Sequence, residues 1–355
     1  MAPVSARQQL QALLRHNAEN AALPALTPEL TSKLAQRLRA LPLFAHSYPF
    51  CRNMDFGGYT TWDYLDFAFR NDLTGVCLHV NDGDRSSLSR MDTAELGRFR
   101  QRLEILGLKL HLEISSTDRA EVNRAIRLAD VLGVVNIRLY ARHEGPLDTV
   151  IERVYADLAE VAEKANRHGL HFDYEQHEDL RAAEIARILE RIGDHRVNAL
   201  FDYTNSWNAL EDPLDALRTL APWVRQVHIK GGRKTVEPTG WGQVGVPQGD
   251  PADSLPGPLL LAELVALGAE TPQVICFALE NEVDYYAPPF RVPNEGVNPI
   301  IAYREPSSTP MPEGADLASV LRYELRWAQQ QVGVTRALAQ RLQILASLID
   351  VASAT

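Results

Sequence analysis

Short apolar runs alternate with longer amphipathic segments along most of this chain. The short runs have the length of buried strands, and the longer segments repeat apolar residues at the three- and four-residue spacing of a helix face. The strands are predicted over residues 43–50, 75–80, 109–114, 134–140, 169–172, 197–201, 224–227 and 274–279. The helices are predicted over residues 60–71, 92–106, 119–132, 147–168, 181–193, 212–222, about 258–268, and from about 316 onward.

This alternation predicts an α/β fold with parallel strands, because strands that are separated by helices pair through crossover connections. Eight strand–helix units favour a closed (β/α)8 TIM barrel. An open, doubly wound sheet is the second choice. The chain lacks a GxGxxG motif after its first strand, which weakens that second choice.

The two ends of the chain add helices to this pattern. Residues 1–41 are predicted to form an N-terminal helical extension, and residues 42–355 to hold the barrel together with C-terminal helices. After Gly333, apolar residues continue at helical spacing as far as Ile349. That stripe either packs under the barrel or pairs with another subunit, in which case the protein is a homo-oligomer.

Two connections are long for a compact domain. Residues 231–257 follow the seventh strand, and residues 283–314, with seven prolines, follow the eighth. Long loops without secondary structure are uncommon unless they cover a site. Both fall at the carboxyl ends of the strands, where barrel enzymes place their chemistry.

Composition and charge narrow the class of protein. Apolar residues make up 45% and charged residues 23%, which is ordinary for a globular protein. The net charge of −10 argues against nucleic acid or an anionic membrane as partner, because both need a basic surface. Three isolated cysteines, no signal-peptide core and no run of membrane-spanning length lead us to expect a cytoplasmic enzyme.

Four predicted strands end in residues that commonly bind metal ions: Glu175, Asp202, His228 and Glu280. Adjacent strand ends of a barrel point into one bowl, so we expect these side chains to hold one divalent cation. Carboxylates with one imidazole suit Mn²⁺, with Mg²⁺, Co²⁺ and Zn²⁺ as alternatives. Such an ion polarises an α-hydroxycarbonyl and stabilises its enediolate, while a carboxylate on each side of the carbon removes and returns a proton.

Each of these residues also has an ordinary structural explanation. An acid at a strand exit often caps the next helix, and a lone histidine on an apolar strand is commonly a hydrogen-bonded core residue. Glu175 lies too far from the next predicted helix to cap it. Four such residues at consecutive strand exits are hard to explain one by one, which favours the metal site.

Several motifs over residues 169–282 resemble the xylose-isomerase-like TIM barrel superfamily, and more narrowly its sugar phosphate isomerase/epimerase group, which includes ketose 3-epimerases. The matching segments are Tyr174-Glu-Gln-His177, Phe201-Asp-Tyr-Thr-Asn205, Glu211-Asp-Pro213, Leu220-Ala-Pro222, Val227-His-Ile-Lys230 and Leu279-Glu280. The resemblance implies that Glu175, Asp202, His228 and Glu280 bind the metal. It also implies that the two glutamates act as the acid/base pair on either face of a bound ketose.

The resemblance also suggests which residues contact the substrate: His177, Asn205, Lys230, Arg233 and Trp241. Two departures from the family pattern bear on the substrate. Many relatives have Lys-Asp after the metal histidine, whereas this chain has Lys230-Gly-Gly-Arg233. The 3-epimerases tend to place a histidine three residues after the aspartate ligand, whereas this chain has Asn205.

The leading hypothesis is a metal-dependent isomerase or epimerase that acts on a sugar or a sugar derivative. The second is a lyase or decarboxylase that acts on a 3-oxo sugar acid through the same metal enolate, with the basic loop holding the carboxylate. Two weaker alternatives are a repair enzyme of the AP endonuclease type, which needs more histidines and a basic surface, and a barrel that binds sugar without turnover.

Overall fold

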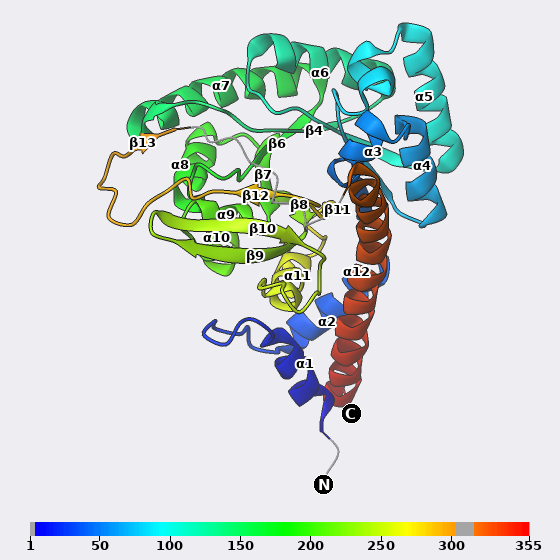
Figure 1. The fold of residues 1–355 in the computed structure, drawn as a ribbon. Coiled ribbons are helices and arrows are strands. Elements are labelled where there is room, and N and C mark those ends of the chain that lie inside the picture. The colour runs from blue at the N-terminus through cyan, green and yellow to red at the C-terminus, as the bar shows by residue number, and fades with distance from the viewer. Residues whose placement is uncertain (1–3, 303–315, 355) are drawn as a thin grey trace.

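The computed structural model describes residues 4–302 and 316–354, and its centre is a closed barrel of eight parallel strands (Figure 1). In order around the barrel, the strands are β1 (Leu43–His46), β11 (Cys276–Leu279), β8 (Val224–Ile229), β7 (Val197–Asp202), β6 (His171–Glu175), β4 (Asn136–Leu139), β3 (Lys109–Glu113) and β2 (Gly75–His79). Almost all their residues are buried, as expected for strands with helices on one face and packed side chains on the other. The predicted (β/α)8 barrel is confirmed.

Helices surround the barrel, and one short helix, α9 (Asn205–Asn208), lies at the carboxyl ends of the strands, where Asn205 lines a cavity. The other helices are α3 (Cys51–Phe56), α4 (Thr61–Arg70), α5 (Thr93–Leu106), α6 (Arg119–Leu132), α7 (Leu147–His168), α8 (Ala182–Ile192), α10 (Pro213–Leu220) and α11 (Gly257–Ala266). Short 3-10 turns are η1 (Leu38–Ala40), η2 (Tyr48–Phe50), η3 (Asp84–Ser86) and η4 (Leu88–Arg90). Local sequence sets the helix ends: Asp92 caps α5, and Gly107 ends it in the left-handed region with a φ of 67°.

The first predicted strand is too long. It ends at His46, and Tyr48-Pro-Phe50 forms η2 instead, because proline fixes its own φ and has no N–H for a strand ladder. This early end turns Tyr48 and His46 toward the carboxyl end of the barrel, where both line a cavity.

The predicted loop 231–257 is largely a β-hairpin. β9 (Gly231–Glu237) and β10 (Gly240–Val246) pair antiparallel, and β12 (Tyr286–Ala287) adds a third strand from the next long connection. Farther along that connection, β13 (Ile300–Ile301) pairs with β5 (Gly145–Pro146). The rest of the predicted loop, residues 303–314, lies outside the described residues.

The terminal helices lie against one another beside the barrel (Figure 1). They are α1 (Ala6–Leu14), α2 (Pro28–Arg37) and α12 (Leu317–Ala354), and α12 continues through Gly333 without a break. The predicted stripe on α12 is buried at Leu342, Leu345 and Ile349, in the same hydrophobic core as Leu10 of α1. These side chains therefore pack within the chain. Among the described residues, no helix has both the length and the apolar surface that a membrane span requires.

Candidate metal centre

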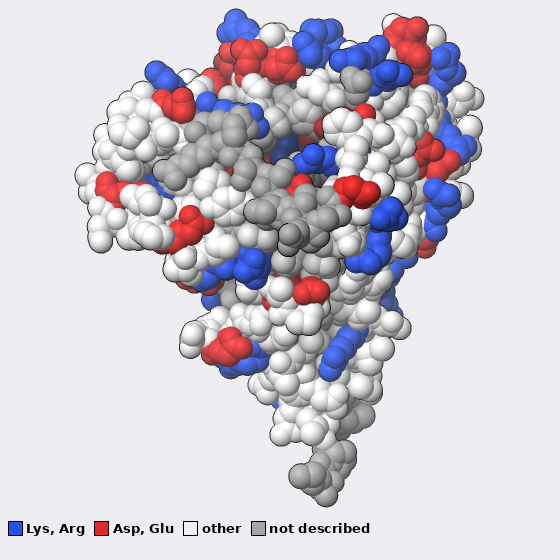
Figure 2. Space-filling view, viewed as in Figure 1, with Lys and Arg blue, Asp and Glu red and all other residues white. Residues whose placement is uncertain are grey.

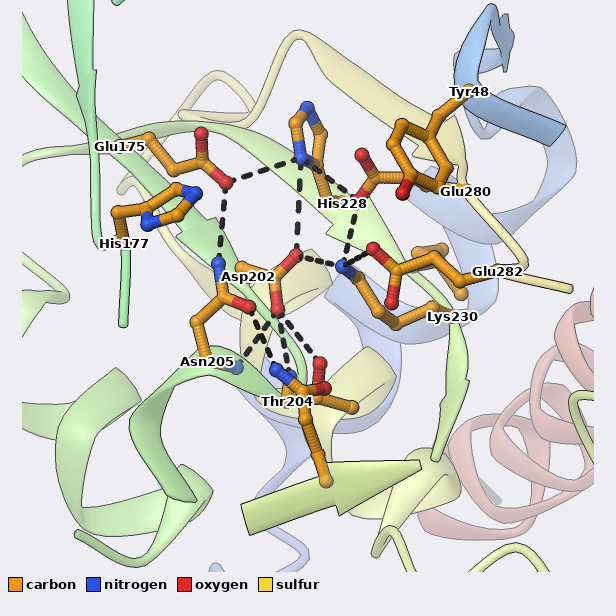
Figure 3. Close-up of polar contacts among 12 residues, drawn as sticks. Tyr48, Glu175, His177, Asp202, Thr204, Asn205, His228, Lys230, Glu280 and Glu282 are labelled. Atoms are coloured by element: carbon orange, nitrogen blue, oxygen red, sulfur yellow. Dashed lines mark hydrogen bonds and ion pairs between the residues drawn. The ribbon is translucent and has the colours of Figure 1, made fainter. Parts of the chain in front are cut away.

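A cavity of about 360 Å³ opens at the carboxyl ends of the barrel strands. Its wall includes charged side chains that follow or end six of the eight strands: His46, Glu113, Arg138, Glu175, Lys230 and Glu280. Below them, Asp202 and His228 are fully buried, and they are paired in register on the neighbouring strands β7 and β8. The fold thus brings the four predicted metal ligands to one place (Figure 3).

His228 lies at the centre of this group. Its Nδ1 is 3.1 Å from Glu280 Oε2, 3.6 Å from Glu175 Oε1 and 3.8 Å from Asp202 Oδ2. Burial by itself lowers the pKa of His228, but the surrounding carboxylates of Glu280, Glu113 and Glu175 raise it well above its usual value. A cation that binds at Nδ1 therefore has to displace a proton, as is usual for metal sites.

One oxygen of Asp202 is held by backbone and the other is left for the site. Asp202 Oδ1 accepts hydrogen bonds from the backbone N–H of Thr204 at 2.8 Å and of Asn205 at 2.9 Å. Asp202 Oδ2 is buried without a hydrogen-bond donor of ordinary geometry, and it faces Lys230 and His228. The turn after β7 thus fixes the direction of the second oxygen.

Glu113, which the sequence did not single out, supports His228 from the other side. Glu113 Oε1 lies 3.4 Å from His228 Nε2, and Glu113 Oε2 lies 2.8 Å from His46 Nε2. A carboxylate beside the second ring nitrogen keeps a proton there and so leaves Nδ1 to face the other three carboxylates. Glu113 and His46 end β3 and β1, so the same strand-exit rule could have found them.

Arg138, one residue before the end of β4, is another residue that the sequence did not single out. Its guanidinium forms a buried ion pair with Glu175 Oε2, and a longer one of 3.8 Å with Glu113. Burial by itself raises the pKa of Glu175, but Arg138, followed by His228, outweighs it and holds the pKa at about 2. Glu175 is therefore a carboxylate at neutral pH, with Oε1 directed at His228.

The ammonium of Lys230 lies among three acids rather than at the far end of the cavity. Lys230 Nζ is 2.9 Å from Asp202 Oδ2, 2.9 Å from Glu280 Oε2 and 3.0 Å from Glu282 Oε1. Burial by itself raises the pKa of Glu280, but His228 and Lys230 hold it well below its usual range. For Glu282, burial dominates and raises the pKa well above its usual range.

The structure places the other predicted contact residues in two different regions. Asn205 donates from Nδ2 to Glu175 Oε1 at 3.3 Å and lines the cavity. His177 also lines the cavity and stacks on Tyr140, with ring centroids 3.9 Å apart, and burial lowers its pKa to about 3. Arg233 is exposed on the hairpin, and Trp241 is half-buried under Lys234, so neither belongs to the cavity wall.

A further acid, Glu178, lies behind this wall. It is fully buried and accepts a hydrogen bond of 2.6 Å from the hydroxyl of Tyr285, which does line the cavity. Burial raises the pKa of Glu178 to about 8. An acid shortly before a helix often caps it, but the N-cap of α8 is Arg181, so Glu178 does not serve as its cap.

The donor set fits a divalent cation. Glu175, Asp202 and His228 each offer one ligand atom, and these three atoms lie within 4.8 Å of one another. His46, His228 and Glu280 form a second such group, which shares His228 with the first. Asp202 Oδ2, Glu280 Oε2 and His228 Nδ1 are buried without hydrogen bonds of ordinary geometry, and the two oxygens have Lys230 as their ion-pair partner. Buried polar atoms usually have partners, and oxygen ligands with one imidazole suit hard or borderline ions, so these atoms could hold such a cation.

Comparisons with known proteins give one family. The family model described as xylose isomerase-like TIM barrel matches residues 65–276. The uncharacterized protein YihM of Escherichia coli (strain K12) is 40% identical over 311 residues, which cover 88% of this chain and 95% of that protein.

Solved structures share the fold at low sequence identity. A xylose isomerase-like TIM barrel protein from Mycobacterium smegmatis, in complex with magnesium, aligns with a TM-score of 0.55 and 12% identity, over 87% of this chain and 99% of that one. A D-psicose 3-epimerase, solved in the presence of D-fructose, aligns with a TM-score of 0.53 and 15% identity, over 82% of this chain and all (100%) of that one.

Proposed function

This chain belongs to the xylose isomerase-like TIM barrel family, and we propose that it is a divalent-metal-dependent isomerase or epimerase of a sugar or sugar derivative. The resemblance read from the sequence motifs is confirmed at the level of the family. The observation that carries the proposal is the convergence of three carboxylate oxygens on His228 Nδ1, beside a cavity that opens at the strand ends.

Glu175, Asp202, His228 and Glu280 would hold the cation, with Mn²⁺ as the ion we favour and Mg²⁺, Co²⁺ and Zn²⁺ as alternatives. When bound, the ion supplies Lewis-acid stabilisation of the negative charge that develops on substrate oxygens. A neighbour of the same fold was solved in complex with magnesium, which supports a divalent metal in this chain.

Glu175 and Glu280 are suited to move a proton between them. They approach His228 from two different sides and both line the cavity (Figure 3). Both have lowered pKa values, so each is ionised and able to accept a proton from a substrate carbon. One carboxylate would remove the proton and become a carboxylic acid, while the other would take up a proton from solvent and deliver it to the substrate carbon. The first would then release its proton to solvent, and the face of delivery would decide the product's configuration.

The cavity offers contacts for a small polyhydroxylated molecule. His177, Asn205 and Lys230 would contact it, and Tyr48 and Tyr140 belong to the same wall. Arg233 and Trp241 lie on the hairpin outside this wall, so any contact they make needs a substrate that extends beyond the cavity.

A lyase or decarboxylase of a 3-oxo sugar acid is the second candidate. The observation in its favour is Arg142, which lines the cavity and could meet a substrate carboxylate. Arg142 Nη2 donates to the Tyr140 hydroxyl at 2.7 Å, whereas Arg138 forms an ion pair with Glu175, and Lys230 forms ion pairs with three acids. Isomerisation needs no additional cation, and for that reason we place it first.

Surface and redox features suit a cytoplasmic enzyme with a small-molecule substrate. Lys and Arg are mixed with Asp and Glu on the face in Figure 2, which gives no continuous basic band for nucleic acid. The described cysteines Cys51, Cys77 and Cys276 are all free, as is usual in a reducing compartment. Leu348 and Val351 of α12 remain exposed and would be the contact in a homo-oligomer.

The test combines metal analysis with isotope exchange. Elemental analysis of purified protein should give about one ion per chain after Mn²⁺ addition, and H228A should lose it. With D-fructose and related ketoses in D2O, the wild type should incorporate deuterium at the substrate carbon, and with a 3-oxo sugar acid it should release no CO2. E175Q should keep the ion and lose on the order of 10²–10⁴-fold in rate. Absence of bound metal, or metal retained in H228A, would overturn the site; CO2 release would favour the lyase.

A further inference from the structure

We propose that Lys230 is a built-in competitor of the divalent ion: its ammonium neutralises Asp202 and Glu280 in the metal-free protein and moves onto Glu282 when the ion binds. This inference rests on the metal site proposed above. It adds a second cation to that site and assigns Glu282 a part in metal uptake.

The ammonium has a complete set of partners in the described structure. An ammonium has three N–H donors, and three carboxylate oxygens lie within 3.0 Å of Lys230 Nζ. The side chain is 3% exposed, so water contributes little. A buried lysine with this many acids costs a large desolvation free energy, which only the close carboxylates offset.

The ion and the ammonium need the same two oxygen atoms. Asp202 Oδ2 and Glu280 Oε2 are each 2.9 Å from Lys230 Nζ, and they are also the oxygens of those residues that face His228 Nδ1. A divalent ion bound to both oxygens and to His228 would lie a few ångströms from a positive charge that is shielded from water. Repulsion in such a buried place is strong, so the ammonium has to withdraw or the ion binds weakly.

Glu282 supplies the place for withdrawal. Of the three acids around Lys230, only Glu282 has no recorded ion pair with His228, and its Oε1 already accepts from Lys230 Nζ at 3.0 Å. Its other oxygen, Oε2, is buried without an ordinary hydrogen-bond partner. The chain that follows Glu282 is tied to the hairpin, because the Gly245 N–H of β10 donates to Tyr285 O at 3.0 Å.

The primary experiment measures Mn²⁺ binding by isothermal titration calorimetry, at one pH, for the wild type and K230M. Loss of the competing charge should tighten Mn²⁺ binding by about tenfold or more, and the metal-free melting temperature should fall because buried carboxylates lose their counter-charge. K234M is the matched control: Lys234 lies over the Trp241 ring outside the cavity, so its loss should leave Mn²⁺ affinity within about twofold.

A double-mutant cycle tests the role of Glu282. E282Q should weaken Mn²⁺ binding in the wild-type background, because the ammonium then stays on Asp202 and Glu280, and should have little effect in the K230M background. If K230M does not fold, E282Q alone decides, and unchanged or tighter binding by it overturns the proposal. Equal or weaker binding by folded K230M also overturns it, while the metal site survives. Absence of Mn²⁺ binding in both the wild type and K230M overturns the metal site itself.

Discussion

Gln331 on α12 connects the C-terminal helix to the two strand exits that carry His228 and Glu280, and we expect its replacement to be costly. It is fully buried; its Nε2 donates to Ile229 O at 2.7 Å, and its Oε1 accepts from Asn281 N at 3.0 Å. In Q331M, Ile229 O keeps its bond from Glu280 N at 2.8 Å, but the Asn281 N–H loses its partner. Losing two net hydrogen bonds and leaving one buried donor unpaired should lower the free energy of unfolding by about 2–4 kcal/mol.

Urea denaturation of the metal-free protein measures this change, with the slope of the transition unchanged and its midpoint lowered. Mn²⁺ affinity should also fall, on the order of tenfold, because supports of metal ligands typically have effects of that size. Q329M is the control: Gln329 is exposed on the same helix and pairs with Asn71 at the surface, so its change should stay within about 0.5 kcal/mol. A Q331M transition within about 0.5 kcal/mol of the wild type would refute the reasoning.

Two more predictions concern packing and pH. A Cβ at Gly245 would clash with the backbone of Glu282, so G245A should lower the free energy of unfolding by about 1–3 kcal/mol. A Cβ at Gly333 would meet open space on α12, so G333A should raise the free energy of unfolding by about 0.5–1 kcal/mol in the same urea assay. Burial raises the pKa of Glu178 from 4.5 to about 8, so the folded state binds its proton more tightly, and this residue's contribution to stability falls as pH rises through that window. E178Q has no ionisable group at this position, so its free energy of unfolding should equal that of the wild type near pH 4 and exceed it near pH 8. If urea denaturation gives the same difference between the two proteins at both pH values, the prediction is wrong.

The sequence was sufficient to predict the barrel because each short parallel strand carries apolar residues that are buried, and several helices between the strands have capping residues that mark their ends. Asp92 and Gly107 of α5 are such signals. The hairpin β9–β10 escaped prediction because glycines alternate with larger residues through β10, and glycine is normally a sign of a loop. The structure gives a reason for one of them: Gly245 lies directly against the backbone of Glu282, where no side chain fits.

The candidate ligands were predictable for a different reason: the position of a residue at a strand exit depends only on the strand pattern. Glu175, Asp202, His228 and Glu280 are such residues, and the structure brings them together. Glu113 occupies an equivalent position on β3, but a single acid at the end of a buried strand also fits a hydrogen-bonded core residue, so the pattern alone did not distinguish it. Its importance appears only with the distances to His228 and His46.

The pairing between charged side chains in the site could not be predicted from the spacing of residues along the sequence. Lys230 follows His228 by two residues, and the sequence suggested that it contacts the far end of a substrate. A lysine side chain has four rotatable bonds, so its ammonium can reach several places from one backbone position, and the acids around it decide which one it occupies. Here three acids surround it, two of which are candidate metal ligands. Lys230 and the cation therefore have to be considered together, and any change of Glu280 or Asp202 alters both the metal site and the lysine's counter-charge.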